Sequence, residues 1–149
     1  MTALLDVHEL GVSYGGVRAV DKLSLTVEPG QIVGLIGPNG AGKTTAIDAL
    51  TGFISRPHGR VMFRDEDVTF EPAHRRVHRG MARTWQSGEL FDDLTVRENL
   101  QVAVDWHSAR GGVDVDTIAR TLGLQDDLDR FPRQLSHGHR KLVAVARSM

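Results

Sequence analysis

The chain has 149 residues, of which 40% are hydrophobic and 25% are charged, with a formal net charge of −1 and no cysteine. This composition is typical of a globular domain, and it excludes a disulfide framework, a thiolate metal site and an electrostatic case for binding nucleic acid. Because no apolar run approaches the ~20 residues that span a bilayer and no signal peptide begins the chain, we expect a cytoplasmic protein that reaches any membrane through a partner.

Two runs of alternating apolar residues open the chain, over residues 4–14 and 17–28. The pair Gly15-Gly16 between them is a turn signal, so we predict two antiparallel strands. Tyr14, the only tyrosine, ends the first of these strands. It is either a half-buried strand residue beside a turn or an aromatic side chain that stacks on an adenine ring.

Residues 31–52 have the order of a strand, a glycine-rich loop and a helix. The apolar run 32–36 has the length and branching of a buried parallel strand. The period then changes to the three-residue spacing of Ile47 and Leu50, which predicts a helix that ends at Gly52. With the loop sequence Gly-Pro-Asn-Gly-Ala-Gly-Lys-Thr-Thr between them, these elements are typical of the phosphate-binding loop of nucleotide triphosphatases.

Each residue type in this loop has a chemical role in holding a triphosphate. Glycines let several backbone N–H groups approach the phosphates, and a helix that begins near Gly42 directs its positive dipole end at them. Lys43 reaches the β- and γ-phosphates, and the hydroxyl of Thr44 is placed to bind Mg²⁺. The alternatives are a glycine-rich turn that binds nothing and a dinucleotide-binding loop, but the spacing is not that of G-x-G-x-x-G.

Beyond the loop helix we predict short strands at 59–63 and 81–85, with a helix at 72–79 between them. That helix carries a basic cluster with His74 and His78. A solvated helix face is favoured over a phosphate or metal site there, because nothing else in the stretch points to a ligand.

From Ser87 onward the pattern is helical. Thr95 and Glu98 fit a capping box, Ile118 belongs to a further short helix, and Ser136 is an N-cap for the last helix. The expected apolar face of the last helix consists of Leu142, Val145, Ala146 and Met149.

These features stand in an order that resembles the ATP-binding subunit of an ABC transporter. Tyr14 and the loop are followed by Arg-Thr-Trp-Gln at 83–86, which resembles a Q-loop, and by Leu-Ser-His-Gly-His at 135–139, which resembles the signature sequence. The sequences at 50–53, 83–86 and 94–99 are most similar to those of the branched-chain amino acid uptake group. Relatives that handle urea, amides or lipopolysaccharide share much of this wording.

The resemblance implies an α/β fold: a P-loop NTPase core with an N-terminal antiparallel β piece over residues 1–87, and an α-helical subdomain over 88–149 that is incomplete at the C-terminus. It implies ATP and Mg²⁺ as cofactors, and a second ATP-binding subunit in a homo- or heterodimer. It also implies membrane permease subunits on the inner face of the cell membrane, served by a periplasmic or extracellular solute-binding protein. The implied function is ATP-driven import of branched-chain amino acids or similar small polar solutes.

Site residues also follow from the resemblance. Tyr14 would stack on adenine, and Gln86 would contact Mg²⁺ and the attacking water. Ser136 and Gly138 would reach the γ-phosphate of the partner subunit's ATP, although Ser136 is also readable as an ordinary N-cap. The phosphate-binding residues would be Gly37, Pro38, Asn39, Gly40, Ala41, Gly42, Lys43, Thr44 and Thr45, with Thr44 on Mg²⁺.

Two departures from the family pattern stand out. His137 and His139 occupy the third and fifth positions of the usual Leu-Ser-Gly-Gly-Gln, and since histidine changes charge between pH 5 and 8, we expect His139 to make assembly sensitive to pH. The family's next strand, an apolar run that ends in Asp-Glu, is not found, so we expect this chain alone to fold poorly and to hydrolyse ATP negligibly. The alternatives are a truncated nucleotide-binding module without hydrolysis and a soluble ABC-type ATPase without a transport role.

Overall fold

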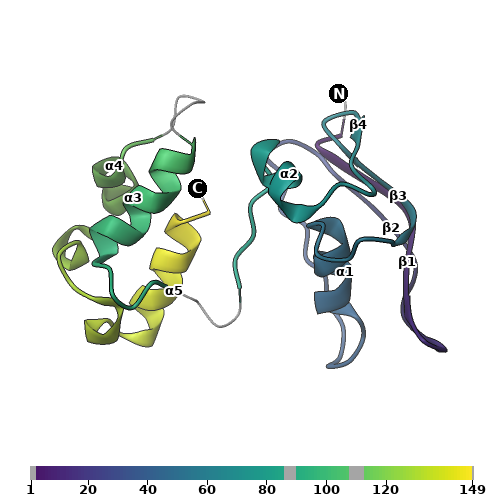
Figure 1. Cartoon of the computed structure of the whole chain (residues 1–149), viewed down its shortest axis with the longest axis horizontal. Coiled ribbons are helices and arrows are strands. Elements are labelled where there is room, and N and C mark those ends of the chain that lie inside the picture. The colour runs from purple at the N-terminus through teal and green to yellow at the C-terminus, as the bar shows by residue number, and fades with distance from the viewer. Residues whose placement is uncertain (1–2, 86–89, 108–112, 149) are drawn as a thin grey trace. The chain divides into compact units, whose positions relative to one another are not determined.

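The computed structural model describes residues 3–85, 90–107 and 113–148. The chain forms two compact units, Met1–Met81 and Ala82–Met149, which are described separately (Figure 1). The first unit contains a sheet and two helices, and the second is helical. None of the helices in the described ranges is long and apolar enough to cross a bilayer.

The sheet of the first unit is built around a hairpin. Strands β1 (Leu5–Tyr14) and β2 (Val17–Val27) pair antiparallel, with Leu5 opposite Val27 and a turn at Gly15-Gly16, which confirms the predicted pair of strands. Their apolar residues alternate, as expected for strands with one buried face. The register shifts at bulges within β1, so the hairpin is strongly twisted.

Two further strands complete the sheet. Strand β3 (His58–Phe63) pairs antiparallel with the free edge of β1, and β4 (Glu66–Asp67) pairs with β3, giving the order β2-β1-β3-β4. The predicted strand at 59–63 is therefore confirmed. Buried apolar side chains from the sheet, the first helix and the residue after β4 form one core: Val7, Leu10, Val12, Val20, Ala46, Ala49, Val61, Phe63 and Val68.

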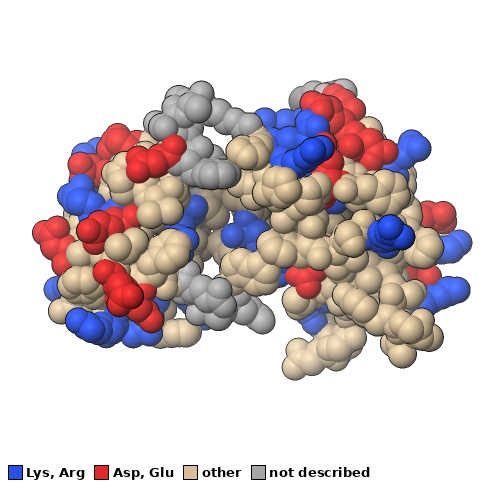
Figure 2. All heavy atoms as spheres, viewed as in Figure 1, with Lys and Arg blue, Asp and Glu red and all other residues tan. Residues whose placement is uncertain are grey.

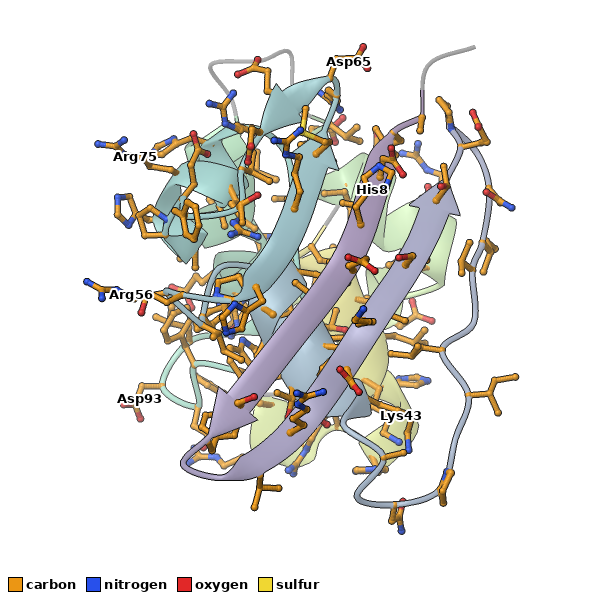
Figure 3. All side chains as sticks on the ribbon, turned by 90° about the vertical axis from the view of Figure 1, so that its right-hand side faces the viewer. His8, Lys43, Arg56, Asp65, Arg75 and Asp93 are labelled. Carbon is orange, nitrogen blue, oxygen red and sulfur yellow. The ribbon has the colours of Figure 1, made fainter. Side chains whose placement is uncertain are left out.

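Two helices belong to this unit. Helix α1 (Lys43–Leu50) lies against one face of the sheet and buries Ala46 and Ala49 (Figures 1 and 3). It ends before Gly52, whose φ of 82° is left-handed, as predicted for a helix that closes there. Helix α2 (Ala73–His78) is one residue shorter at each end than the predicted helix at 72–79, because Pro72 is its N-cap and Arg79 its C-cap.

Two predicted strands are not found. Residues 31–38 run outside the sheet, and Ile32 and Ile36 are 97% and 95% exposed. Residues 81–85 likewise have no strand pairing. A buried parallel strand needs neighbouring strands that satisfy its backbone N–H and C=O groups. Within the described residues, all strand pairs of the sheet are antiparallel, and none of them includes either segment. The predictions for 32–36 and 81–85 are therefore wrong for this structure.

Within its described residues, the second unit packs three helices and two short 3₁₀ turns. These are α3 (Val96–His107), α4 (Val115–Leu122), η2 (Gln125–Asp127), η3 (Pro132–Gln134) and α5 (His137–Ala146). Their buried apolar residues form a separate core: Val96, Leu100, Val115, Ile118, Ala119, Leu124, Leu128, Leu135, Val143 and Ala146.

Helix ends in this unit follow the sequence signals closely. The backbone N–H of Thr95 donates to the Glu98 carboxylate at 2.7 Å, and the N–H of Glu98 donates back to the Thr95 hydroxyl at 3.3 Å, which confirms the capping box. The apolar face expected for α5 needs correction. Val143 is fully buried with Ala146, whereas Leu142 and Val145 are 37% and 44% exposed, because the helix turns the 143/146 stripe toward the core.

Candidate nucleotide-binding site

The glycine-rich loop leads directly into α1. Gly40 and Gly42 have φ values of 83° and 82°, a left-handed conformation that glycine adopts without strain. Gly42 is the N-cap of α1, and a Cβ atom there would lie 2.0 Å from the carbonyl oxygen of Ala19 in β2. The loop is thus fixed against the hairpin by a contact that only glycine permits.

Lys43 lies at the first position of α1, where its side chain folds back onto the loop (Figure 3). Its ammonium donates to the carbonyl oxygens of Gly37 at 2.7 Å and Pro38 at 2.6 Å. An ammonium group has three donors, so these two carbonyls do not exhaust its capacity. The positive charge is therefore held beside the N-terminus of α1, where a phosphate would be received.

The helix end itself is suited to an anion. The first N–H groups of a helix, here those of Lys43, Thr44 and Thr45, have no intrahelical acceptor, and they carry the positive end of the dipole. The first turn of α1 contains no acidic residue that would compete for them. The loop glycines, the ammonium and the helix terminus together fit a triphosphate.

Two residues were expected to hold Mg²⁺. Thr44 is exposed on the first turn of α1, so its hydroxyl is accessible to an ion bound with the phosphates. Gln86 lies outside the described residues. Within the described ranges no group of three or more His, Cys, Asp or Glu residues is arranged to hold a metal.

Tyr14 is located at the hairpin end of β1, opposite Val17, and is 58% exposed. The half-buried alternative for this residue is therefore wrong. Ala19, which Gly42 approaches, lies two residues beyond Val17 in the same hairpin. A ring with this exposure is available for stacking.

In the second unit, Ser136 is the N-cap of α5, as predicted. Its hydroxyl accepts from the backbone N–H of His139 at 3.2 Å. A Cβ atom at Gly138 would lie 3.8 Å from the Ser136 hydroxyl, so this turn has room for a larger residue.

His139 is held by a partner that the sequence did not reveal. Its ring Nδ1 pairs with a carboxylate oxygen of Asp127, which is 3% exposed. The other carboxylate oxygen accepts from Arg130 at 2.7 Å. In the sequence, only the position of Asp127 near the apolar residues Leu124 and Leu128 hinted at its burial.

Two more buried polar residues escaped the sequence analysis. Asn99 is fully buried, and its side chain bonds the backbone of Phe91 in both directions at 2.9 and 3.0 Å. Arg76, in the basic cluster expected to be a solvated face, is 1% exposed. The expectation holds for His74 and His78 but is wrong for Arg76, whose i, i+3, i+4 spacing with Ala73 and Val77 was the available signal.

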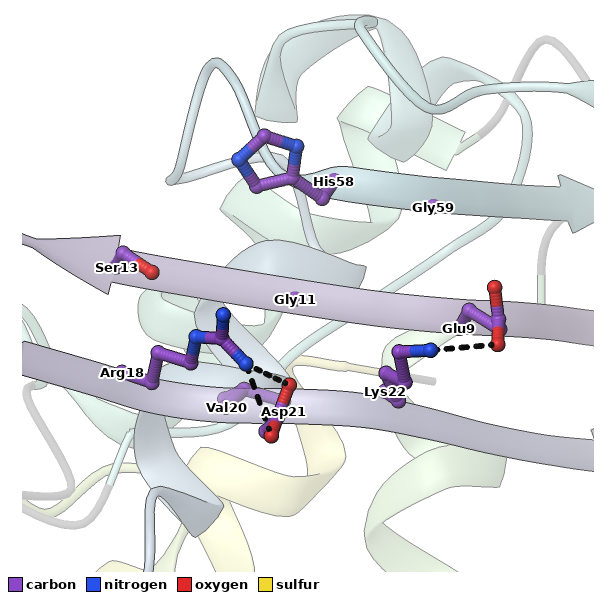
Figure 4. Close-up of a pocket in the computed structure, with 9 residues that line it drawn as sticks. All are labelled: Glu9, Gly11, Ser13, Arg18, Val20, Asp21, Lys22, His58 and Gly59. Carbon is purple, nitrogen blue, oxygen red and sulfur yellow. Dashed lines mark hydrogen bonds and ion pairs between the residues drawn. The ribbon is translucent and has the colours of Figure 1, made fainter.

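A pocket of about 390 Å³ lies on the sheet face that points away from the core (Figure 4). Gly11 and Gly59 leave its floor open, and two ion pairs cross it, Lys22 with Glu9 at 3.5 Å and Arg18 with Asp21 at 3.3 Å. Since these charges neutralise one another, the pocket has no net attraction for a phosphate. It contains none of the predicted site residues.

Charge on the molecular surface is mixed. On the face seen in Figure 2, acidic and basic side chains of the described residues alternate without a broad basic area.

The glycine loop, Lys43 and the bare N-terminus of α1 define a P-loop nucleotide-binding domain. The chain belongs to the ABC transporter family, whose model matches residues 20–149. This membership and the likeness to solved ATP-binding cassettes confirm the predicted fold class, an ABC-type P-loop ATPase with an antiparallel β piece and helices.

Named relatives include two transport proteins. The chain is 37% identical over 99% of its length to the putative 2-aminoethylphosphonate import ATP-binding protein PhnT of Salmonella typhi, and it covers 40% of that protein. It is 34% identical over 99% of its length to the lipopolysaccharide export system ATP-binding protein LptB of Escherichia coli K12, covering 63% of it. The chain therefore spans about half the length of these relatives. Neither is named for amino acid uptake.

Among solved structures, the chain is similar to MJ1267, an ATP-binding cassette of an ABC transporter. The TM-score is 0.85 at 29% identity, over 99% of this chain and 65% of that one. A nucleotide-free ATP-binding cassette matches with a TM-score of 0.83.

Proposed function

We propose that this chain is the nucleotide-binding part of an ATPase that couples ATP binding and hydrolysis to transport across a membrane. The observation that carries the proposal is the Lys43 ammonium, held 2.7 Å from the Gly37 carbonyl beside the N-terminus of α1. Membership of the ABC transporter family supplies the transport role.

Within the site, each residue has a separate task. The N–H groups of the loop and of the first turn of α1 bind the β- and γ-phosphates, and Lys43 exchanges its carbonyl partners for phosphate oxygens. Tyr14 stacks on the adenine ring. Thr44 and Gln86 hold Mg²⁺, which when bound neutralises charge on the phosphates.

A second subunit completes the site. Ser136 and Gly138, at the N-terminus of α5, face the γ-phosphate of the ATP bound to the partner, so that two nucleotides hold two subunits together. Membrane permease subunits dock on the helical unit and place the protein at the inner face of the membrane. A solute-binding protein on the other side delivers the cargo.

The proposed cargo is a branched-chain amino acid or a similar small polar solute. This choice depends on the sequence wording at 50–53, 83–86 and 94–99. The named relatives act on phosphonate import and lipopolysaccharide export, so the choice is tested directly: ATPase activity of the full-length protein with its permease should rise when the solute-binding protein is loaded with leucine. A rise with a phosphonate alone would contradict it.

For the chain of 149 residues we propose nucleotide binding with negligible hydrolysis. No apolar run ending in Asp-Glu occurs in it, and the family's Mg²⁺-associated aspartate and catalytic glutamate are expected there. Turnover well above that of a Lys43→Ala variant would contradict this proposal.

Nucleotide binding can be tested on lysine reactivity, because Lys22, Lys43 and Lys141 are the only lysines. Acetylation with limiting reagent is followed by mass spectrometry, with and without MgATP. ATP should protect Lys43 and leave the exposed Lys22 and Lys141 unchanged, so these two serve as internal controls. Equal reactivity of Lys43 with and without ATP would overturn the proposed site.

A further inference from the structure

We propose that Arg76 is a positioning residue for the nucleotide site, which fixes the P-loop helix α1 from the end opposite to Lys43. The inference rests on the proposed function, since it concerns the same helix. Arg76 is contributed by α2 and touches none of the groups expected to bind nucleotide.

The guanidinium of Arg76 is enclosed and donates to four main-chain carbonyls. It is 1% exposed, and one terminal nitrogen donates to the last carbonyls of α1, Ala49 at 3.0 Å and Leu50 at 2.6 Å. The remaining donors bind Thr69 at 3.0 Å and Glu71 at 2.9 Å. One side chain therefore joins the end of α1 to the segment between β4 and α2.

The positive charge of Arg76 also suits the C-terminal end of a helix. The C-terminus of a helix carries negative partial charge and unsatisfied carbonyls, and the last turn of α1 contains no basic residue of its own. Arg76 supplies both the cation and the donors from another element. Burial lowers the pKa of its guanidinium, while the carboxylates of Glu71 and Asp67 act in the opposite direction.

Gly52 makes the close approach possible. It has a φ of 82°, and a Cβ atom there would lie 2.7 Å from the Ala73 nitrogen, 2.8 Å from the Glu71 oxygen and 2.9 Å from Nε of Arg76. The backbone that follows α1 therefore packs against Arg76 with no room for a side chain at position 52. This is a dedicated junction and not an incidental surface contact.

The ends of α1 matter because its middle is weakly held. The helix has eight residues, and its buried side chains are the small Ala46 and Ala49, whereas Ile47 is 41% exposed. Two further contacts hold the ends of the helix: Gly42 against Ala19 at the N-terminus, and Arg76 at the C-terminus. A tilt released at the Arg76 end moves Lys43 and Thr44 relative to the loop.

Arg79 offers a matched control on the same segment. It binds both carboxylate oxygens of Glu71, at 2.7 and 2.8 Å, and also pairs with Glu66. Like Arg76 it is a cation close to Glu71, but its hydrogen bonds go to carboxylates and not to the end of α1. Its loss should lower stability without changing the orientation of the P-loop helix.

The experiment compares the affinity of Arg76→Gln and Arg79→Gln for a fluorescent, non-hydrolysable MgATP analogue. It is run at a temperature where circular dichroism shows both variants folded. We expect Arg76→Gln to bind about tenfold more weakly or worse and Arg76→Lys to be intermediate, because lysine keeps the charge without the planar fork. Arg79→Gln should stay within about twofold of the unmodified chain.

A second measurement uses the unmodified chain and remains decisive if Arg76→Gln does not fold. The Nε–H resonance of Arg76 should shift when the MgATP analogue is added, although Arg76 lies at the far end of α1. If the unmodified chain binds no nucleotide, the proposed function fails and this inference fails with it. If it binds, but the Arg76 resonance is unmoved or Arg76→Gln binds equally well, only the positioning role is overturned.

Discussion

The ammonium of Lys43 and the carbonyl of Gly37 are joined by a hydrogen bond of 2.7 Å, so the glycine-rich loop is closed by its own lysine. The same ammonium binds Pro38 at 2.6 Å. Neutral carbonyls are weaker partners for a cation than phosphate oxygens, because only the phosphate adds the attraction between two full opposite charges. The loop therefore holds its cation in place without binding it too strongly for a nucleotide to capture.

Replacing Lys43 with Gln should weaken MgATP binding by about a hundredfold, since one charge-assisted contact to phosphate is lost. The fold of the first unit should be retained, because Lys43 contributes nothing to its apolar core. Isothermal titration calorimetry measures the affinity, and Lys141→Gln in the second unit is the control. Equal affinity of the two variants would contradict the assigned role of Lys43.

Gly42 and Gly40 form a matched pair for testing the loop backbone. Both have left-handed φ values, but a Cβ atom at Gly42 meets the Ala19 oxygen at 2.0 Å, whereas none of the described atoms lies within 4 Å of one at Gly40. We expect Gly40→Ala to cost about 1 kcal/mol of unfolding free energy and Gly42→Ala clearly more, about 3 kcal/mol, because the clash is with backbone. Urea unfolding measures both values. Equal costs would mean that the contact between the loop and β2 is not formed in solution.

Local sequence signals predicted much of this structure. The hairpin, α1 and the Thr95–Glu98 capping box each depend on residues close together in the chain, and each is found. The sequence could not locate Arg76 or Asp127, because a charged residue is buried only when distant groups meet it. It also misassigned 32–36, since apolar content reveals a capacity for burial but not the neighbours that achieve it.

The exposure of 32–36 can be tested with polar substitutions. Ile36→Asn should change the free energy of unfolding by less than about 0.5 kcal/mol, because Ile36 is 95% exposed. Val61→Asn, at a fully buried position of β3, should cost about 3 kcal/mol or more. A large loss for Ile36→Asn would show that this segment is buried in solution, as the sequence alone predicted.

The first unit should lose stability in acid through Glu71. Paired with Arg79, Glu71 has a pKa below its ordinary value near 4.5. A carboxylate with a lowered folded pKa adds stability that is present above the unfolded pKa and is lost as the pH falls through the folded pKa. The free energy of unfolding should therefore fall below pH 4.5, and Glu71→Gln should flatten this decline. Glu28→Gln, at an exposed position, is the control. If the unfolding free energy of Glu71→Gln falls with decreasing pH as steeply as that of the unmodified chain, the pairing with Arg79 is contradicted.

Asp127 should be the polar residue on which the start of α5 depends. Asp127 is 3% exposed, and its carboxylate accepts hydrogen bonds from both Arg130 and His139, so it links α5 to η2. Asp127→Asn keeps the shape but leaves one of these donors facing an amide N–H₂, and we expect a loss of about 1–3 kcal/mol in unfolding free energy. The neighbouring Asp126 is exposed, so Asp126→Asn should change stability by less than about 0.5 kcal/mol. If urea unfolding gives the same value for both variants, the Asp127–His139 contact does not hold the signature helix in place.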